Sequence, residues 1–322
     1  MSNSGCNGSH YIPEEILINV LSRLPVKSLI RFTCVCKLWS SLIRSSRFIG
    51  MHLNRNVTNH AHAFIIALHE RRRESKICFT LFSNETFEPC LKIKHLLTGP
   101  KIHIHGSSNG LVCLSHELWN LDTATYLCNI SIQKHVVLPP TSILCFPWPE
   151  YATGVAFGFH PRLNNYKVHI GLCSRKRMLL IIVYCLSIPT DSEVFEELLL
   201  PDAVEPMPYY CKVLISEYKG SICLLQSNRD FRAGNDYIDM WVLQEKSFKK
   251  LLTVYLPGQW SFYPLAITMS NELLVGYPCG IYLCSYNLET KQVTETGIKL
   301  AVDCYNNYNT HTYVESLVLL RE

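Results

Sequence analysis

Apolar side chains recur at helical spacing near the start of the chain. Pro13 suits a first helical turn, Glu14 and Glu15 favour the positive end of a helix dipole, and Pro25 ends the pattern. The apolar stripe between the two prolines consists of Ile16, Leu17, Val20, Leu21 and Leu24. This spacing predicts a short helix over residues 13–24.

Two more short helices are predicted, over residues 26–32 and 35–43. Their apolar positions are Leu29, Ile30 and Phe32 in the first, and Val35, Cys36, Trp39, Leu42 and Ile43 in the second. A unit of about 40 residues rarely holds itself together by its own core. We therefore expect part of this apolar surface to be buried against another chain.

After residue 55 the pattern changes to short β-branched and aromatic runs that are separated by turn residues, which is typical of an all-β domain. Six hairpin-like units recur at residues 79–93, 118–130, 157–170, 183–200, 240–254 and 282–295. Their turns are roughly 28 to 54 residues apart, mostly the length of a propeller blade. The expected fold class is α+β overall, with three helices followed by a propeller-like ring of hairpins. An open or barrel-like stack of hairpins is the alternative.

Composition and charge exclude several classes of protein. Charged residues are 17% and hydrophobic residues 48% of the 322, so the chain has enough apolar residues for a folded core. The net charge of +4 is small, and the basic clusters at 71–73 and 175–177 fall between strand-like segments, so no nucleic-acid partner is expected. The longest apolar run, residues 178–188, is too short to cross a membrane.

The N-terminal ten residues lack a basic start and an apolar core, so no secretory signal is expected. The 15 cysteines are then expected to stay reduced and to behave as small apolar residues. We expect a cytoplasmic protein, with the nucleus as the alternative.

No sequence motif indicates catalysis, a cofactor or a metal site. His60, His62, His103 and His105 come in alternating pairs, which are more typical of one face of a strand than of a metal site. Trp119, Trp148, Trp241 and Trp260 could line a glycan site, although aromatic residues in strands usually belong to the core. We predict no catalytic residue and no cofactor.

Residues 11–50 resemble the F-box, the motif through which substrate receptors dock on the Skp-type adaptor of cullin-RING ubiquitin ligases. The likeness rests on Ile12-Pro13, Glu15, Ile16, Val20-Leu21, Leu24-Pro25, Leu29, Val35-Cys36-Lys37 and Trp39. It implies that the adaptor-facing residues include Pro13, Leu17, Leu21, Leu24, Pro25, Leu29, Cys36 and Trp39. The alternative is that these residues form only an internal three-helix core.

The rest of the chain resembles the F-box-associated domain of plant F-box proteins, and is most similar to the S-locus F-box group. The likeness rests on residues 80–90, 104–115, 239–251, 271–274, 283–302 and 314–320. Between the strand that contains Lys167 and Glu196-Glu197, this chain is shorter than the family pattern. We therefore expect a domain that is short of about one blade, which puts ring closure in doubt.

The stretch from Met178 to Cys211 has no Lys or Arg, and it carries six acidic groups. These are Asp191, Glu193, Glu196, Glu197, Asp202 and Glu205. An acidic loop would attract a basic target, and the S-locus likeness implies basic secreted ribonucleases as targets. A solvated loop without a partner explains the charges equally well.

The sequence thus predicts an F-box over residues 11–55 and a substrate-recognition β domain over residues 56–322. The predicted function is a non-catalytic subunit of an SCF-type ligase, which binds a Skp-type adaptor, a cullin and a protein substrate. Three alternatives stay open: an F-box receptor for an immune or hormone-signalling target, a cytosolic glycan-binding protein, and a truncated receptor without a substrate.

Overall fold

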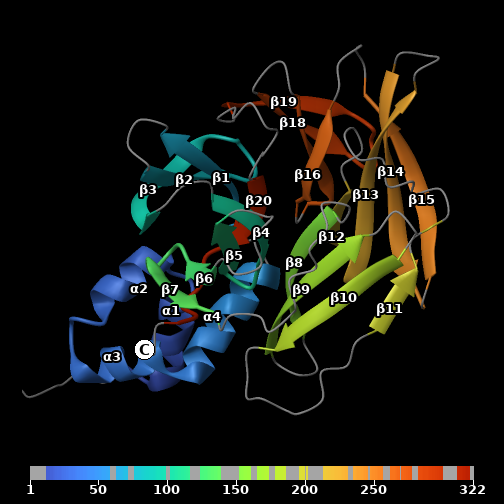
Figure 1. Cartoon of the computed structure of the whole chain (residues 1–322). Helices are drawn as coiled ribbons and strands as arrows, with labels where there is room; N and C mark the ends of the chain where they lie inside the picture. Colours follow the sequence, from blue (N-terminus) through green and yellow to red (C-terminus); the bar gives the residue numbers. More distant parts are fainter. Residues whose placement is uncertain are drawn as a thin grey trace, which may run out of the picture.

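The computed structural model describes most of the chain as helices followed by strands (Figure 1). The described residues are 12–58, 63–71, 76–98, 102–116, 124–138, 152–160, 165–173, 178–185, 196–199, 201, 213–230, 235–245, 247–256, 262–268, 270–277, 282–299 and 310–319. The helices are α1 (Glu14–Leu21), α2 (Val26–Phe32), α3 (Lys37–Arg44) and α4 (Ser46–Thr58). We refer to residues 12–58 as the helical module.

Local sequence signals explain where the first three helices begin. Pro13 and Pro25 directly precede α1 and α2, and proline's missing N–H costs nothing at a helix start. Cys36 precedes α3, and its Sγ accepts a hydrogen bond from the Trp39 backbone N–H at 3.5 Å. The three predicted helices are confirmed, with boundaries that differ by a few residues.

Helix α4 was not predicted. Its buried residues are Phe48, Ile49, His52 and Asn56, and two of these four are polar. Because polar side chains on the inner face interrupt the apolar periodicity, a prediction based on the spacing of hydrophobic residues does not detect this helix.

The strands form five antiparallel four-stranded sheets in the described part of the chain, which we number as blades along the sequence. The first blade contains β1 (Ala63–Arg71), β2 (Lys76–Ser83) and β3 (Pro89–Thr98), and the second β4 (Ile102–Ser108), β5 (Leu111–His116), β6 (Thr125–Asn129) and β7 (Lys134–Val137). The third contains β8 (Ala152–His160), β9 (Asn165–Cys173), β10 (Met178–Cys185) and β11 (Glu196–Leu199). The fourth contains β12 (Val213–Tyr218), β13 (Ser221–Asp230), β14 (Asn235–Gln244) and β15 (Ser247–Tyr255), and the fifth β16 (Tyr263–Ile267), β17 (Glu272–Gly276), β18 (Tyr282–Asn287) and β19 (Val293–Lys299).

The last strand, β20 (Thr310–Val314), joins the first blade by pairing with β1, so that Ala63 lies opposite Val314. The first strands of the other blades, β4, β8, β12 and β16, contact one another in sequence, and β20 contacts both β4 and β16. The five sheets therefore close into a ring, and the propeller-like prediction is confirmed. The doubt about ring closure was wrong, because the stretch around Lys167 completes a four-stranded third blade.

Uneven spacing of the predicted hairpins also has an explanation. The units at 157–170 and 183–200 both belong to the third blade, where they form the β8–β9 and β10–β11 pairs. Their short separation is therefore a distance within one blade, not the length of a blade. Whether relatives carry an additional blade stays a prediction.

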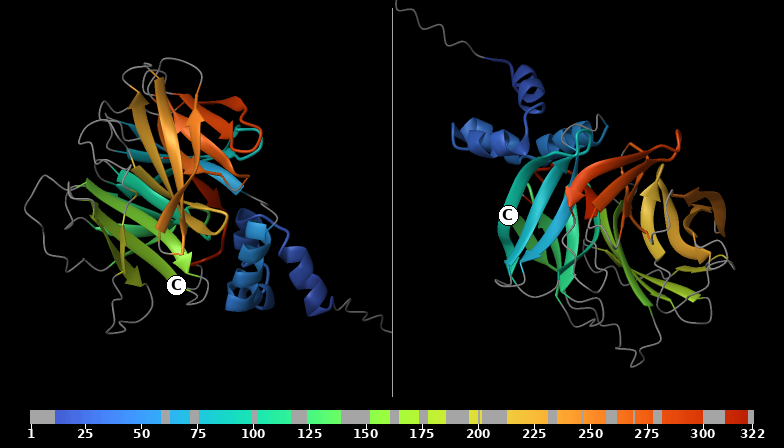
Figure 2. Two further views of the ribbon diagram at one scale, coloured as in Figure 1. Left: turned by 90° about the vertical axis from the view of Figure 1, so that its right-hand side faces the viewer. Right: turned by 90° about the horizontal axis from the view of Figure 1, so that it is seen from above.

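Apolar layers between neighbouring blades make up the core of the ring. One layer lies between the first and second blades and includes Phe79, Ile104, Val112 and Tyr313. Another lies between the fourth and fifth blades and includes Ile238, Met240, Phe262 and Val275. Figure 2 shows the helical module to one side of the ring, beside strands of the first two blades. It packs there on Ile132 of the β6–β7 turn and on Leu317 and Val318, which follow β20.

Candidate functional site

The helical module exposes large apolar side chains that do not contribute to its core. Exposed fractions are 57% for Ile12, 55% for Ile16 and Val20, 60% for Val35 and 61% for Leu38. In the whole described chain only nine large apolar side chains are so exposed, and five of them lie in this small module. Such a concentration is typical of a protein-binding surface. We call these five residues the exposed apolar set.

The eight residues predicted to face an adaptor fall into two groups. Leu17, Leu21 and Leu29 are buried and belong to the core of the module, together with Val26, Ile43 and Phe48. Pro13 and Cys36 are exposed, whereas Leu24, Pro25 and Trp39 are partly buried. The structure thus brings Leu17, Leu21 and Leu29 together inside the module, and their contact with an adaptor stays a prediction.

Reasoning from sequence left out the exposed apolar set. Ile12, Ile16, Val20 and Val35 contributed to the motif but were not among the predicted adaptor-facing residues, and Leu38 was not noticed. On α1 the signal was available, because Ile16 and Val20 form a stripe next to the buried stripe of Leu17 and Leu21. A helix that is apolar on two adjoining faces has more than its own core to cover.

Trp39 supports the module from within rather than lying freely on its surface. Its ring packs edge-on against Phe32, with 5.4 Å between the ring centroids. This contact joins α2 to α3, and the hydrogen bond from the Trp39 backbone to Cys36 fixes the first turn of α3. Such aromatic pairs contribute about 0.5 to 1.5 kcal/mol beyond area burial.

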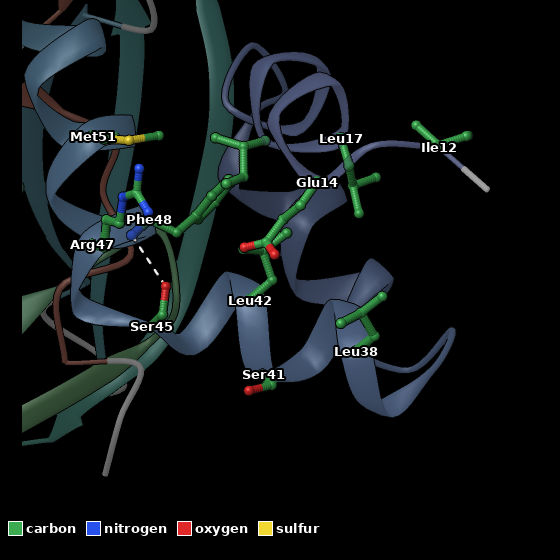
Figure 3. Close-up of a pocket in the computed structure, with 11 residues that line it drawn as sticks. Ile12, Glu14, Leu17, Leu38, Ser41, Leu42, Ser45, Arg47, Phe48 and Met51 are labelled. Atoms are coloured by element: carbon green, nitrogen blue, oxygen red, sulfur yellow. Dashed lines mark hydrogen bonds between the residues drawn. The ribbon is translucent and has the colours of Figure 1, made fainter.

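A groove of about 300 Å³ lies beside the exposed apolar set, between α1, α3 and α4 (Figure 3). Ile12, Leu17, Leu38, Leu42, Phe48 and Met51 supply its apolar lining, and Glu14 and Arg47 are charged groups at the same groove. Ile12 and Leu38 belong both to the groove and to the exposed apolar set. The groove therefore adjoins the exposed apolar set at these two residues, and we treat the groove and the set together as the candidate docking surface.

The ring holds a cluster of histidines that cannot easily be protonated. His103 and His105 lie on one face of β4, and the His105 Nε2 is 2.6 Å from the Ser115 Oγ. Burial is the main cause that lowers the pKa of His105 to about 3, and His103 and His311 lower it further. Among the residues that the structure describes, no three metal-binding side chains are grouped to hold a metal ion. His60 and His62 lie outside the described residues.

Three buried cysteines of the ring, Cys113, Cys128 and Cys223, keep their protons at neutral pH. Burial raises the pKa of the Cys128 thiol and of the Cys223 thiol to about 12, and it raises the pKa of the Cys113 thiol as well. A thiol that keeps its proton is a poor nucleophile and a poor metal ligand. These residues therefore act as small apolar side chains, as predicted.

Of the six acidic residues of the stretch from Met178 to Cys211, two lie among the described residues. Glu196 and Glu197 lie in β11, an outer strand of the third blade, rather than in a loop. The other four acidic residues lie outside the described residues: Asp191, Glu193, Asp202 and Glu205.

Three of the four tryptophans considered for a glycan site also lie outside the described residues: Trp119, Trp148 and Trp260. The remaining predicted tryptophan, Trp241, has the Lys250 Nζ 5.7 Å from its ring centroid. No described helix is long and apolar enough to cross a membrane.

Comparison with known proteins shows what the helical module and the rest of the chain are similar to. Residues 10–49 match the F-box domain family. An F-box protein of Arabidopsis thaliana is 28% identical over 89% of this chain and 90% of its own length. A second one is 35% identical over 49% of this chain and 41% of its own length, and an F-box/kelch-repeat protein of the same plant is 28% identical over 49% and 44%. This chain spans less than half the length of the latter two relatives.

Solved structures add little to this comparison. Virginiamycin B lyase of Staphylococcus aureus is similar over 72% of this chain and 69% of its own, with 12% identity and a TM-score of 0.32. That score is too low to carry an argument. The F-box domain and the plant F-box relatives support, in general terms, a role in substrate recognition within an SCF-type ubiquitin ligase.

Proposed function

We propose that this protein is the substrate-recognition subunit of an SCF-type (cullin-RING) ubiquitin ligase. The helical module docks on a Skp-type adaptor, which links it to a cullin, and the β ring holds a protein target for ubiquitylation. In this proposal the receptor is a non-catalytic adaptor subunit. It acts by proximity, because it raises the effective concentration of a target lysine near the ubiquitin-carrying enzyme.

One observation carries the proposal: the exposed apolar set lies in the segment that matches the F-box domain. Burying apolar area contributes about 25 cal/mol per Å², so five half-exposed side chains represent a substantial unsatisfied driving force. The adjoining groove offers a recess for an apolar segment of the adaptor. An adaptor surface that covers both would leave Leu17, Leu21 and Leu29 as the supporting core beneath it.

The target is proposed from the sequence likeness. Residues 56–322 are similar to the F-box-associated domain of the S-locus F-box group, which suggests a basic secreted ribonuclease in pollen self-incompatibility as the target. The six acidic groups between 191 and 205 support a basic target, since opposite charge speeds encounter. A cytoplasmic location, where such ligases and cullins meet their targets, is part of the same proposal.

The proposal is tested by affinity purification of the tagged full chain from plant cells. The test variant is Ile16→Asp with Val20→Asp, because both side chains are exposed and the fold should tolerate the charges. The control is Leu251→Asp, which places one such charge on an exposed apolar residue of β15 in the ring, away from the helical module. Leu21→Asp is less informative, because Leu21 is buried and its loss would unfold the module.

We expect the unaltered chain and the Leu251→Asp control to recover the adaptor and the cullin, and the double variant to recover neither. Proteins that co-purify with the unaltered chain and with the Leu251→Asp control are then candidate targets. A basic ribonuclease from pollen tubes would support the finer proposal, and an immune or hormone-signalling protein would replace it. Recovery of the adaptor by the double variant at the unaltered level would exclude the exposed apolar set as the docking surface.

A further inference from the structure

The chain enters and leaves the ring at the same place. Helix α4 ends at Thr58, and β1 begins at Ala63, directly opposite Val314 of β20. Only residues 59–62 separate α4 from β1, and a single covalent link of this kind leaves the helical module free to rotate unless other contacts restrain it. The residues that follow β20 supply such contacts. We call Glu315, Ser316, Leu317 and Val318 the strap.

The strap is anchored on the ring by Asn129, which is fully buried at the end of β6. Its Nδ2 donates to the Ser316 carbonyl oxygen at 2.9 Å, to the Ser316 Oγ at 3.1 Å and to the Val318 carbonyl oxygen at 2.8 Å. Its Oδ1 accepts from the Tyr313 hydroxyl at 3.1 Å and from the Ser131 backbone N–H at 3.0 Å. One amide therefore ties the strap to β20 and to the β6–β7 turn.

The strap reaches the helical module through a side chain, a carbonyl and an apolar contact. The Val26 backbone N–H, at the start of α2, donates to the Glu315 Oε2 at 3.2 Å. The Asn56 Nδ2 of α4 donates to the Glu315 carbonyl oxygen at 3.1 Å. Leu317 is fully buried in the apolar core of the module. A four-residue segment thus contacts both α2 and α4.

Hydrogen bonds continue from Asn56 to the segment that joins α1 and α2. Asn56 Nδ2 lies 3.4 Å from the His52 Nδ1, and the His52 Nε2 donates to the Leu24 carbonyl oxygen at 3.0 Å. Because a carbonyl oxygen can only accept, His52 carries its proton on Nε2 and accepts on Nδ1. A continuous hydrogen-bonded chain therefore runs from Glu315 through Asn56 and His52 to the segment that joins α1 and α2.

Glu315 supplies a side-chain hydrogen-bond acceptor at the start of α2, which the residue before the helix does not. Pro25, the residue before α2, has no side chain that can accept a hydrogen bond from the first turn. The first N–H groups of a helix have no partner within it, and a carboxylate there also favours the positive end of the helix dipole. Glu315 is 8% exposed, so water does not readily replace it.

From these contacts we propose that the strap fixes the direction in which the helical module presents its docking surface relative to the ring, with Glu315 as the positioning residue. The proposal rests on the proposed function for its purpose, since a ligase transfers ubiquitin only to lysines that the adaptor-bound enzyme can reach. The strap sets that reach by holding the adaptor-binding module and the target-binding ring at one angle.

The experiment uses the full chain with a lysine-reactive cross-linker and mass spectrometry. Lys27 of α2 and Lys37 of α3 are exposed reporters on the module, and Lys92, Lys219, Lys249 and Lys291 are exposed reporters on the ring. Variants are Glu315→Ala, and Glu315→Gln, whose amide oxygen still accepts from Val26. Hydrogen exchange of the peptide that contains Val26 is measured alongside.

We expect Glu315→Ala to gain module-to-ring cross-links that the unaltered chain lacks, and the Val26 amide to exchange about tenfold faster. Glu315→Gln should keep the original pattern, and the melting temperature of the ring should be unchanged in both. If Glu315→Ala does not fold, Glu315→Asp replaces it, because the shorter side chain withdraws the carboxylate from Val26. An identical cross-link pattern in Glu315→Ala or Glu315→Asp and in the unaltered chain would overturn the proposal, and so would new cross-links in Glu315→Gln.

Adaptor capture is measured separately on the same variants, so that the two proposals can fail independently. New cross-links in a chain that never captures an adaptor would uphold the positioning role and reject the ligase function. Adaptor capture with an unchanged cross-link pattern in Glu315→Ala would uphold the function and reject the positioning role. Adaptor capture by Glu315→Ala at the unaltered level, together with new cross-links, supports both.

Discussion

At the scale of single residues, the second blade depends on a glycine whose role is visible only in three dimensions. Asn109 and Gly110 form the two-residue turn between β4 and β5, with φ angles of 47° and 78°. Asn-Gly is the preferred pair for such a turn, so the turn was predictable from sequence. The contact between this turn and Ser316 of the strap was not predictable, because the two are far apart in the sequence.

Gly110→Ala is expected to destabilise the protein much more than the same change at Gly220. Both glycines have φ of 78°, where an alanine is strained by about 1 to 2 kcal/mol. At Gly110 the new Cβ would also lie 2.1 Å from the Ser316 Oγ, whereas at Gly220 nothing lies within 4 Å. Overpacking adds about 1 to 3 kcal/mol. The free energies of unfolding of the two variants, from urea titrations, measure the difference, and equal losses would show that the contact with Ser316 yields without cost.

At the scale of elements, sequence patterns identified helices and hairpins well where one face is apolar and less well where polar residues are buried. The helices before and after Pro25 followed from apolar spacing. Helix α4 did not, because His52 and Asn56 occupy its inner face and are satisfied by Leu24 and Glu315. The partners that make these polar residues acceptable in a core come from other elements, so no local pattern can show them.

Strand β4 was likewise predictable as a strand, but the residues that pack against it were not. Its alternating His103 and His105 indicated one face, and the structure buries that face. His311 of β20 donates from its Nε2 to the Ile104 carbonyl oxygen at 3.2 Å, and burial lowers the pKa of His311 to about 4. The neighbouring strands β4 and β20 therefore carry histidines that stay neutral at pH 7.

These histidines should make the ring less stable in mild acid. In the unfolded chain a histidine has a pKa of about 6.5, whereas in the fold the pKa of His105 is about 3 and that of His311 about 4. Below pH 6.5 the unfolded chain therefore binds more protons than the folded chain. Stability is complete above pH 6.5 and falls as the pH approaches 4. For His105 the loss between pH 7 and pH 5 is about 2 kcal/mol.

Urea titrations at pH 7 and pH 5 measure this loss, and His105→Gln is the control. Glutamine has no proton to gain in this range, so the variant should be less stable at pH 7 but should lose less on acidification than the unaltered chain. Carboxylates contribute equally to both chains and cancel in the comparison. An equal loss in both chains would mean that His105 is protonated without cost in the fold.

At the scale of the whole molecule, the sequence predicted a propeller-like ring but left its closure in doubt. Counting hairpins along the chain assumes that each repeat marks a new blade, and the pairs β8–β9 and β10–β11 break that assumption. The strand that closes the ring, β20, is short and lies after residues 300–309, so nothing near it in sequence shows its partner. Closure by pairing of distant strands is a property of the tertiary fold.

Strand β20 and the strap join three things at one place: the first blade, the second blade and the helical module. A chain that stops at residue 309 loses the partner of β1, the Tyr313 side chain in the layer between the first two blades, and the Leu317 contact with the module. We therefore expect it to unfold at a much lower temperature, with a broad transition, because an open ring exposes the apolar layer that β20 covers.

The matched control is a chain that stops at residue 319, which keeps β20 and the strap and should melt as the full chain does. Calorimetry of the three chains measures the effect. Loss of the sharp transition only in the chain that stops at 309 would show that the closing strand, rather than chain length, makes the ring cooperative. Unchanged melting of the chain that stops at 309 would show instead that the blades are stable as separate units. Ring closure would then contribute little stability, and the role of the strap in the full chain would be limited to holding the module on the ring.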